Sequence, residues 1–250
     1  MYVEKSIVQS VEKINNSTFL LKVFSPSIAS TIKPGQFCNV KVSESNFPLL
    51  RRPFSICNVE EDYIFFLFDL HGEGTKILSK KKEGDELDVL GPLGKGFNFD
   101  GDYETAVIVA GGLGSAPFPY LLKKLDPNKN VKCLVGARSS EIVVTHQLKN
   151  VSIATDDGSA GFKGNVVELL KNEIQQLRNV RIFACGPNVM LKALQEYCIS
   201  NKLDCQISVE CAMACGFGIC QGCPIETYDK QSYKLVCKDG PVFNADEVSL

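Results

Sequence analysis

Four cysteines near the end of the sequence have the residue type and spacing of metal ligands. Cys215, Cys220 and Cys223 follow the pattern C-x4-C-x2-C, and Cys237 comes later in the tail. Thiolates are soft donors that suit iron and sulfide, and four of them complete the coordination of two bridged irons. The spacing therefore predicts that these four cysteines hold one 2Fe–2S cluster.

Two alternatives for this tail carry less weight. A structural zinc site usually pairs two C-x2-C knuckles, and only Cys220 and Cys223 form one here. Cys211 could replace Cys215, but that choice would lengthen the first spacing to eight intervening residues. We therefore favour iron over zinc, and we expect Cys211 to be a buried thiol or a thiol beside the ligands.

Composition limits the partners and the location. The chain has 250 residues, 44% of them hydrophobic, and a net charge of −2, so no basic field attracts nucleic acid or a membrane. The first residues lack the apolar core of a signal peptide, and no apolar run is long enough to span a bilayer. Eleven cysteines in such a chain predict reduced thiols used for metal binding or catalysis, in a cytoplasmic protein.

Two kinds of pattern precede the tail. In the first hundred residues, short β-branched or aromatic runs are separated by turn residues, which is typical of a small antiparallel barrel. These runs are 19–24, 37–42, 63–70 and 86–90. Further on, unbroken apolar strands alternate with helical periodicities, which predicts a parallel sheet covered on both faces. The strands are 106–110, 131–135, 151–154 and 180–184, and the helices include 116–125 and 188–200.

The predicted fold class is therefore β plus α/β, in three parts. A β-barrel covers 1–100, an α/β nucleotide-binding domain covers 101–205, and a small iron–sulfur domain covers 206–250.

Two segments of the predicted barrel have flavin-binding chemistry. Arg52-Pro53-Phe54-Ser55 lies where a barrel strand would end, and Gly74-Thr75 precedes a helix-like stretch at 76–82. An arginine fork suits a pyrophosphate, an aromatic ring can lie along an isoalloxazine, and a Gly-Thr turn offers backbone N–H groups to phosphate. Each segment alone has an ordinary explanation, as a surface strand or as a plain turn with a helix cap.

Two turns follow strands of the predicted parallel sheet. Gly112 and Gly114 lie in a glycine-rich turn at a helix start, where phosphate binds, although the third glycine of a dinucleotide fingerprint is replaced by Pro117. The Cys185-Gly186-Pro187 turn follows the last parallel strand, and Cys185 taken alone would be a buried core thiol. One arginine, Arg138, without a basic cluster favours NAD over NADP.

In this order, the segments resemble the ferredoxin-NADP reductase superfamily, whose barrels bind FAD through an R-x-[YF]-S segment and a later Gly-Thr turn. The resemblance implies an isoalloxazine ring beside Phe54 and Ser55, with the pyrophosphate beside Arg52, Gly74 and Thr75. It also implies that Cys185-Gly186-Pro187 lies beside the nicotinamide. Backbone groups of three further residues would border the flavin, and these are Leu67, Phe68 and Asp69.

The whole chain resembles the family of dihydroorotate dehydrogenase B electron-transfer subunits. The motifs that carry this resemblance are RRPFSI, HGEGT, GPLGKGF, AGGLGSAP, TDDGSAGFKGNV, CGP, MACGFGICQGC and CKDGPVF. It implies a relay in which dihydroorotate is oxidised at FMN in a separate catalytic subunit. Electrons then pass through the 2Fe–2S cluster and FAD of this chain to NAD+, in pyrimidine biosynthesis. The implied complex is a heterotetramer with two copies of each subunit.

Two rival functions remain open at this point. The first is a flavin and 2Fe–2S subunit of a transhydrogenase or a sulfide dehydrogenase, which would share the fold and the cofactors. The second is a non-enzymatic zinc-binding interaction module. We assign no catalytic side chain, because hydride transfer between flavin and nicotinamide needs orientation rather than a general base, and neither His71 nor His146 is expected to act as one.

Overall fold

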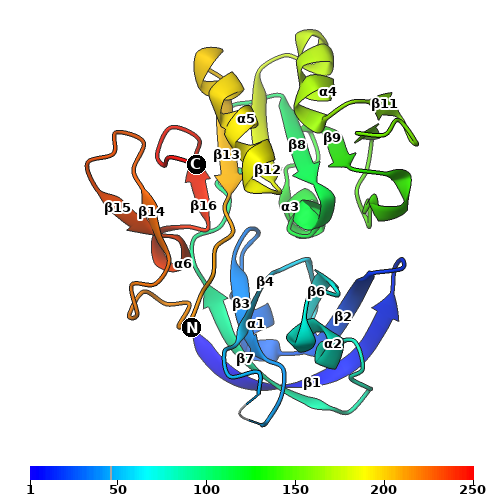
Figure 1. Ribbon diagram of the computed structural model, residues 1–250, viewed down its shortest axis with the longest axis vertical. Coiled ribbons are helices and arrows are strands. Elements are labelled where there is room, and N and C mark those ends of the chain that lie inside the picture. The colour runs from blue at the N-terminus through cyan, green and yellow to red at the C-terminus, as the bar shows by residue number, and fades with distance from the viewer. Residues whose placement is uncertain (46) are drawn as a thin grey trace.

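The computed structural model describes residues 1–45 and 47–250 and contains two large sheets and one small one. In Figure 1 the first sheet lies at the bottom, the second lies at the top, and the end of the chain forms a separate lobe on the left. No helix in the described part of the chain is long and apolar enough to cross a membrane.

The first sheet is antiparallel and has the strand order β4-β3-β7-β1-β2-β6-β5. Its strands are β1 (Tyr2–Lys13), β2 (Thr18–Phe24), β3 (Phe37–Lys41), β4 (Arg52–Ser55), β5 (Asn58–Glu60), β6 (Tyr63–Asp69) and β7 (Glu86–Leu93). The sheet is strongly curled, because Phe54 of β4 packs against Phe66 and Phe68 of β6, with ring centroids 6.0 and 5.8 Å apart. This curled sheet, with the short helices α1 (Pro26–Ala29) and α2 (Glu73–Leu78), confirms the predicted antiparallel barrel.

Three local features differ from the sequence prediction. The longest strand, β1, was not predicted, because half of its residues are exposed and it carries no apolar run. The segment Arg52–Ser55 is itself a strand rather than the end of one. Helix α2 begins at Glu73 and ends at Leu78, earlier than the predicted stretch, so Gly74 and Thr75 lie inside its first turn.

The second sheet has the order β11-β10-β9-β8-β12-β13-β16, and only β16 runs antiparallel to its neighbour. Its strands are β8 (Thr105–Gly111), β9 (Asn130–Ala137), β10 (Val151–Thr155), β11 (Phe162–Lys163), β12 (Val180–Cys185), β13 (Asp204–Ser208) and β16 (Val242–Asn244). Helices α4 (Val166–Glu173) and α5 (Asn188–Ser200) contribute to the core on one face, and α3 (Phe118–Lys124) contributes to the core on the other. Alternate residues of β8 accordingly point to opposite cores, as both faces of the sheet are covered.

The tail leaves the second sheet and returns to it. After β13 it forms a long loop, the hairpin of β14 (Pro224–Glu226) and β15 (Tyr233–Leu235), and the short helix α6 (Val236–Asp239), before β16 pairs with β13. The buried amide of Gln195 in α5 donates hydrogen bonds to the carbonyls of Ala245 and Val248, at 2.6 and 2.7 Å. The tail and the nucleotide-binding unit therefore share a sheet, while the domain boundaries at 100 and 205 remain predictions.

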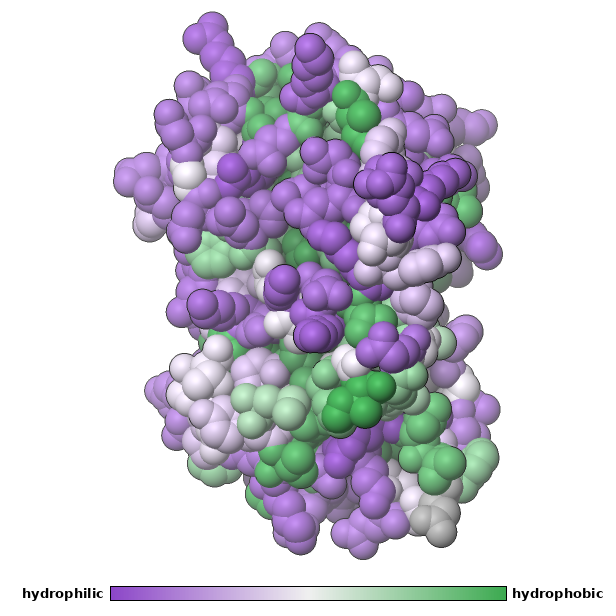
Figure 2. All heavy atoms as spheres, turned by 90° about the vertical axis from the view of Figure 1, so that its left-hand side faces the viewer, coloured by the Kyte–Doolittle hydropathy of each residue, from purple (hydrophilic) through white to green (hydrophobic). Residues whose placement is uncertain are grey.

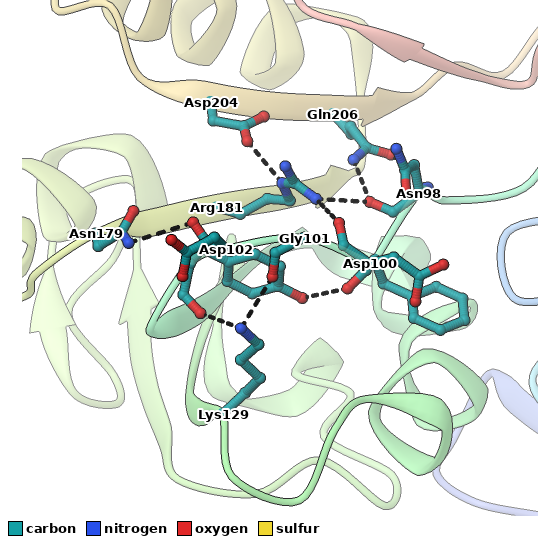
Figure 3. Close-up of polar contacts among 11 residues, drawn as sticks. Asn98, Asp100, Gly101, Asp102, Lys129, Asn179, Arg181, Asp204 and Gln206 are labelled. Carbon is teal, nitrogen blue, oxygen red and sulfur yellow. Dashed lines mark hydrogen bonds and ion pairs between the residues drawn. The ribbon is translucent and has the colours of Figure 1, made fainter.

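A network of polar contacts fastens the connection between the two large sheets (Figure 3). The Arg181 guanidinium of β12 donates to the Asp204 carboxylate at 2.6 Å and to the carbonyl of Asp100 at 2.5 Å. The Gln206 amide of β13 both donates to and accepts from the backbone of Asn98, at 2.6 and 2.8 Å. Because Arg181 and Gln206 lie on the neighbouring strands β12 and β13, the connecting segment is fixed against these two strands.

Candidate functional site

A cavity of about 370 Å³ lies between the curled sheet, the second sheet and the tail. All but one of the barrel residues that sequence reasoning assigned to FAD line it. The lining members are Arg52, Pro53, Phe54, Ser55, Leu67, Phe68, Asp69 and Thr75. The cavity is largely apolar with a few polar groups, which is the usual character of a cofactor site.

Gly74, the remaining residue, lies directly beneath Arg52. A Cβ atom added at Gly74 would approach Arg52 Nε to 2.8 Å, so the arginine side chain lies across this glycine. Thr75 accepts a hydrogen bond from the backbone N–H of His71 at 2.7 Å, which orders the turn that leads into α2. The two segments proposed for the pyrophosphate, far apart in the sequence, therefore meet at one end of the cavity.

The opposite wall of this cavity comes from residues that sequence reasoning did not assign to it. They include Leu113 and Pro117 of the glycine-rich turn, and Glu210, Cys211 and Met213 of the tail, whereas Phe37 of β3 lines the cavity beside Ser55, its partner in β4. His71 also lines the cavity although its side chain is exposed. No local pattern marks these residues, because their position depends on how the second sheet and the tail pack against the barrel.

A second cavity of about 590 Å³ lies at the carboxyl ends of the parallel strands. It is lined by Gly112 from the turn after β8, Pro187 from the turn after β12, and Arg138 and Asp156, which follow β9 and β10. Ligands of open α/β sheets bind at this edge. The lining therefore fits a nucleotide with a ribose near Asp156 and Arg138.

Three of the predicted nucleotide-site residues pack beneath the two cavities rather than line them. A Cβ atom at Gly114 would overlap the Cys185 carbonyl oxygen and come within 2.7 Å of Gly186 Cα, so only glycine lets the two turns touch. Cys185 is 1% exposed, and burial raises the pKa of its thiol, with the nearby carboxylate of Glu210 adding to the shift. Cys185 is therefore a neutral thiol that supports the turn next to Pro187.

The four predicted cluster ligands form two sulfur pairs. Cys223 and Cys237 are buried, with their sulfurs 3.2 Å apart. The side chains of Cys215 and Cys220 are hydrogen-bonded, and the backbone N–H of Cys220 also donates to Cys215 Sγ at 3.5 Å. Within the described residues no three metal-binding side chains converge on the position of a single ion. Two pairs of thiols match a cluster with two irons, each of which takes two cysteine ligands.

The backbone around Cys215 favours a thiolate. Burial acts to raise its pKa, but hydrogen bonds from the backbone N–H groups of Cys220, Phe217 and Ile219 outweigh it and lower the pKa to about 6. Iron binds the thiolate form, and N–H groups aimed at sulfur are the contacts that surround a cluster. The loop therefore fits an iron–sulfur cluster by its donor set and by the charge that its backbone stabilises.

Cys211 lies between the first cavity and the sulfur pairs. It lines the cavity and also contacts Cys223, and its pKa is raised to about 11 by burial and by that neighbouring thiol. This half-buried position is the one expected for a thiol beside the ligands. It also means that a single side chain separates the proposed flavin site from the proposed cluster.

Taken together, the curled antiparallel sheet, the parallel sheet and the cysteine-rich tail define a reductase of the ferredoxin-reductase-like fold with an appended iron–sulfur domain. Residues 210–249 match a family model described as the iron–sulfur cluster binding domain of dihydroorotate dehydrogenase B. An electron transfer subunit of dihydroorotate dehydrogenase B from Desulforamulus reducens is 36% identical, with 96% of each chain covered. The corresponding subunit of Caldanaerobacter subterraneus subsp. tengcongensis is 42% identical, with 86% of each covered. The chain belongs to this family of dihydroorotate dehydrogenase B electron transfer subunits.

Solved structures of other reductases share the fold of this chain. The NADH-dependent reduced ferredoxin-NADP oxidoreductase superimposes with a TM-score of 0.88 at 27% identity, covering 99% of this chain and 91% of that one. A ferredoxin NADP+ reductase from Neisseria gonorrhoeae has a TM-score of 0.65 at 19% identity, covering 80% of this chain and 92% of that one, and shows the shared fold. The family model describes the tail as iron–sulfur binding, which sets aside the alternative of a zinc-binding module.

Proposed function

We propose that this chain is the electron-transfer subunit of a dihydroorotate dehydrogenase B, which receives electrons from dihydroorotate oxidation and delivers them to NAD+. The observation that carries the proposal is the position of Cys211. This residue lines the first cavity, where FAD is proposed to bind, and contacts Cys223, one of the four paired cysteines. Two redox groups held at these sites would be separated by one side chain. Such closeness is what electron transfer between them requires.

The three proposed cofactor sites follow one another through the molecule. The glycine-rich turn separates the two cavities, because Gly112 lines the second one while Leu113 and Pro117 line the first. Cys211 similarly separates the first cavity from the cysteine pairs. When bound, a 2Fe–2S cluster supplies one-electron chemistry, NAD+ takes a hydride, and FAD can do both. The residues around the middle cavity therefore have the task of binding FAD and excluding water.

The residues of the middle cavity have distinct proposed roles. Arg52, Gly74 and Thr75 hold the FAD pyrophosphate, and the ring lies against Phe54 and Ser55. The apolar residues Leu67 and Phe68 exclude water from the ring. In the second cavity, Asp156 accepts a hydrogen bond from the ribose of NAD.

A catalytic partner subunit follows from the family, whose members are named electron transfer subunits. We propose that this partner carries FMN and docks over the cluster loop. Cys220 is exposed there, next to Ile219, which is 75% exposed. Leu49 and Leu50, in the connection between β3 and β4, are also exposed. Figure 2 shows green, hydrophobic side chains gathered across the lower half of this face, which is the left side in Figure 1.

The two apolar segments are both anchored to the same residue of β3. Arg51 donates a hydrogen bond to the carbonyl of Asn39, and the Asn39 amide donates to the carbonyl of Cys215, so both segments meet at this residue. Exposed apolar patches of this kind mark protein interfaces. The proposal includes two copies of each subunit in the complex and a cytoplasmic location, where reduced cysteines are available as iron ligands.

The visible absorption spectrum of the purified chain, with iron, sulfide and flavin quantified, tests the proposal directly. We expect a brown protein with two irons, two sulfides and one FAD per chain, the composition of one 2Fe–2S cluster and one flavin. A colourless protein with stoichiometric zinc would contradict the proposal, because zinc is a d10 ion without visible absorption.

The similarity to the NADH-dependent reduced ferredoxin-NADP oxidoreductase favours one second candidate. In that case the chain would exchange electrons with ferredoxin in a transhydrogenase-type complex. Mixing the loaded chain with a dihydroorotate dehydrogenase catalytic subunit and, separately, with reduced ferredoxin distinguishes the two functions. Complex formation and NAD+ reduction from dihydroorotate support the first function, and NAD+ reduction from ferredoxin alone supports the second.

A further inference from the structure

Asn39 joins the antiparallel barrel, which is proposed to bind the flavin, to the cysteine-rich loop at Cys215 by a buried hydrogen bond. The residue lies in the middle of β3 and is 0% exposed. Its side-chain Nδ2 donates to the carbonyl oxygen of Cys215 at 3.2 Å, across a sequence separation of 176 residues. Among the described residues, its Oδ1 has no hydrogen-bond partner.

The loop backbone at Gly216 packs closely against the Asn39 amide. A Cβ atom added at Gly216, whose φ is +82°, would overlap Asn39 Nδ2 and come within 3.2 Å of Leu93. Glycine at this position therefore lets the loop backbone rest directly on the amide. Two residues earlier on the same strand, Phe37 lines the first cavity. Residues i and i+2 share a face of a strand, so β3 touches both proposed cofactor sites from one face.

Folding of the barrel alone does not account for an asparagine at this position. A buried amide with an unpaired oxygen carries a desolvation penalty, and an apolar residue of similar shape would remove it. Buried polar groups in folded proteins normally have partners, and those without one are frequently found where function demands them. The hydrogen bond to Cys215 is the one feature of Asn39 that an apolar residue could not replace.

We infer that Asn39 is a positioning residue that fixes the first cluster ligand, Cys215, against the flavin barrel. This inference rests on the proposed function, in which Cys215 is an iron ligand. The backbone N–H groups that surround Cys215 Sγ belong to Phe217, Ile219 and Cys220, so they are placed correctly only while the start of the loop is held. Without the hydrogen bond from Asn39, the loop backbone at Cys215 is no longer held against the barrel, and the cluster is released more easily.

Substitution by leucine isolates this role, because leucine keeps the volume and removes the donor. The full chain carrying Asn39→Leu is loaded with cluster, and iron release to an excess of chelator is followed by the loss of visible absorbance. We expect release about five- to tenfold faster than from the unsubstituted chain, which is the factor that one lost buried hydrogen bond represents. The thermal unfolding midpoint of the cluster-free chain should change little, because removal of the unpaired buried Oδ1 offsets the loss of the hydrogen bond to the Cys215 carbonyl.

Asn58 provides the matched control. It is another buried asparagine of the same barrel, but its amide donates to Glu60 and Gln147, away from the tail. We expect Asn58→Leu to lower the unfolding midpoint and to leave iron release unchanged. If Asn39→Leu does not fold, Asn39→Ser, whose hydroxyl is too short to reach the Cys215 carbonyl, should give the same acceleration.

The outcomes separate this inference from the function on which it rests. An unsubstituted chain that binds no cluster contradicts the proposed function. A chain that binds its cluster and releases iron at the same rate, whether position 39 carries asparagine, leucine or serine, contradicts the inference alone.

Discussion

The thiol sulfurs of Cys223 and Cys237 lie 3.2 Å apart in the interior of the tail. Their backbones are joined as well, since the N–H of Val236 donates to the carbonyl of Cys223 at 3.0 Å. The two buried thiols therefore lie side by side at the base of the hairpin of β14 and β15, with Cys223 just before β14 and Cys237 just after β15. Cys215 and Cys220 form the second pair on the outer side of the loop, where Cys220 is exposed.

Substitution of the four paired cysteines should remove the cluster, whereas substitution of Cys211 should not. Serine at Cys220 or Cys237 leaves one iron with a weaker oxygen ligand, so we expect iron and sulfide content to fall to a small fraction of the unsubstituted value. Cys211→Ser is the control and should keep full iron content. The opposite pattern, with Cys211 required and Cys215 dispensable, would show that the ligand set is wrong.

Arg52 should be needed for FAD binding, and its neighbour Arg51 should not. Arg51 is engaged in an ion pair with Asp88 at 2.8 Å, whereas Arg52 lies over Gly74 and lines the first cavity. Loss of charge-assisted hydrogen bonds costs about 1.5–3 kcal/mol, so Arg52→Ala should weaken FAD binding by about tenfold or more. Fluorescence titration of the flavin-free chain measures this, with Arg51→Ala as the control. Equal loss in both variants would place the pyrophosphate elsewhere.

Asp156 should set the preference for NAD over NADP. Its carboxylate lines the second cavity, where it can accept a hydrogen bond from a ribose hydroxyl and would repel a 2′-phosphate. We expect Asp156→Asn to reduce the ratio of NAD to NADP affinity by about tenfold, which corresponds to about 1.4 kcal/mol. Asp157, which accepts hydrogen bonds from Ser159 instead, is the matched control. An unchanged ratio in Asp156→Asn would remove this residue from the ribose site.

Arg181 should contribute to stability through the connection between the two sheets. Its side chain is 17% exposed and donates to Asp204 and to backbone carbonyls of the connecting segment. Because Arg181→Ala leaves these acceptors unpaired, we expect the free energy of unfolding to fall by about 1–3 kcal/mol. The exposed ion pair of Lys5 and Glu86, at 3.5 Å, is the control, and Lys5→Ala should cost about 0–1 kcal/mol. Chemical denaturation of both variants measures the difference.

Local patterns were sufficient to predict the parallel sheet. The apolar strands near 106–110 and 180–184 appear as β8 and β12 within one residue at each end, and helix α5 spans Asn188–Ser200 as predicted. These elements are buried on both sides or have strong periodicity, so their residues carry a clear signal. Spacing alone also predicted four cysteines as cluster ligands; the fold arranges them as two pairs, and their role as ligands stays a prediction.

The rest depends on contacts between distant parts of the chain. Strand β1 is half-exposed and lacks an apolar run, so no periodicity marks it. Glu210, Cys211 and Met213 line the first cavity only because the tail folds back over the barrel. Asn39 is likewise an ordinary polar residue in the sequence, and its bond to Cys215 exists only in the folded chain.

The most direct test of the central claim is coupled electron transfer in the assembled complex. The cofactor-loaded chain is mixed without oxygen with an FMN-containing dihydroorotate dehydrogenase catalytic subunit, and NADH is measured after dihydroorotate and NAD+ are added. We predict one NADH for each orotate formed. With Cys220→Ser we predict no NADH, although the catalytic subunit still oxidises dihydroorotate with an artificial acceptor. Undiminished NADH formation by the Cys220→Ser chain, or none by the loaded unsubstituted chain in a stable complex, would contradict the account.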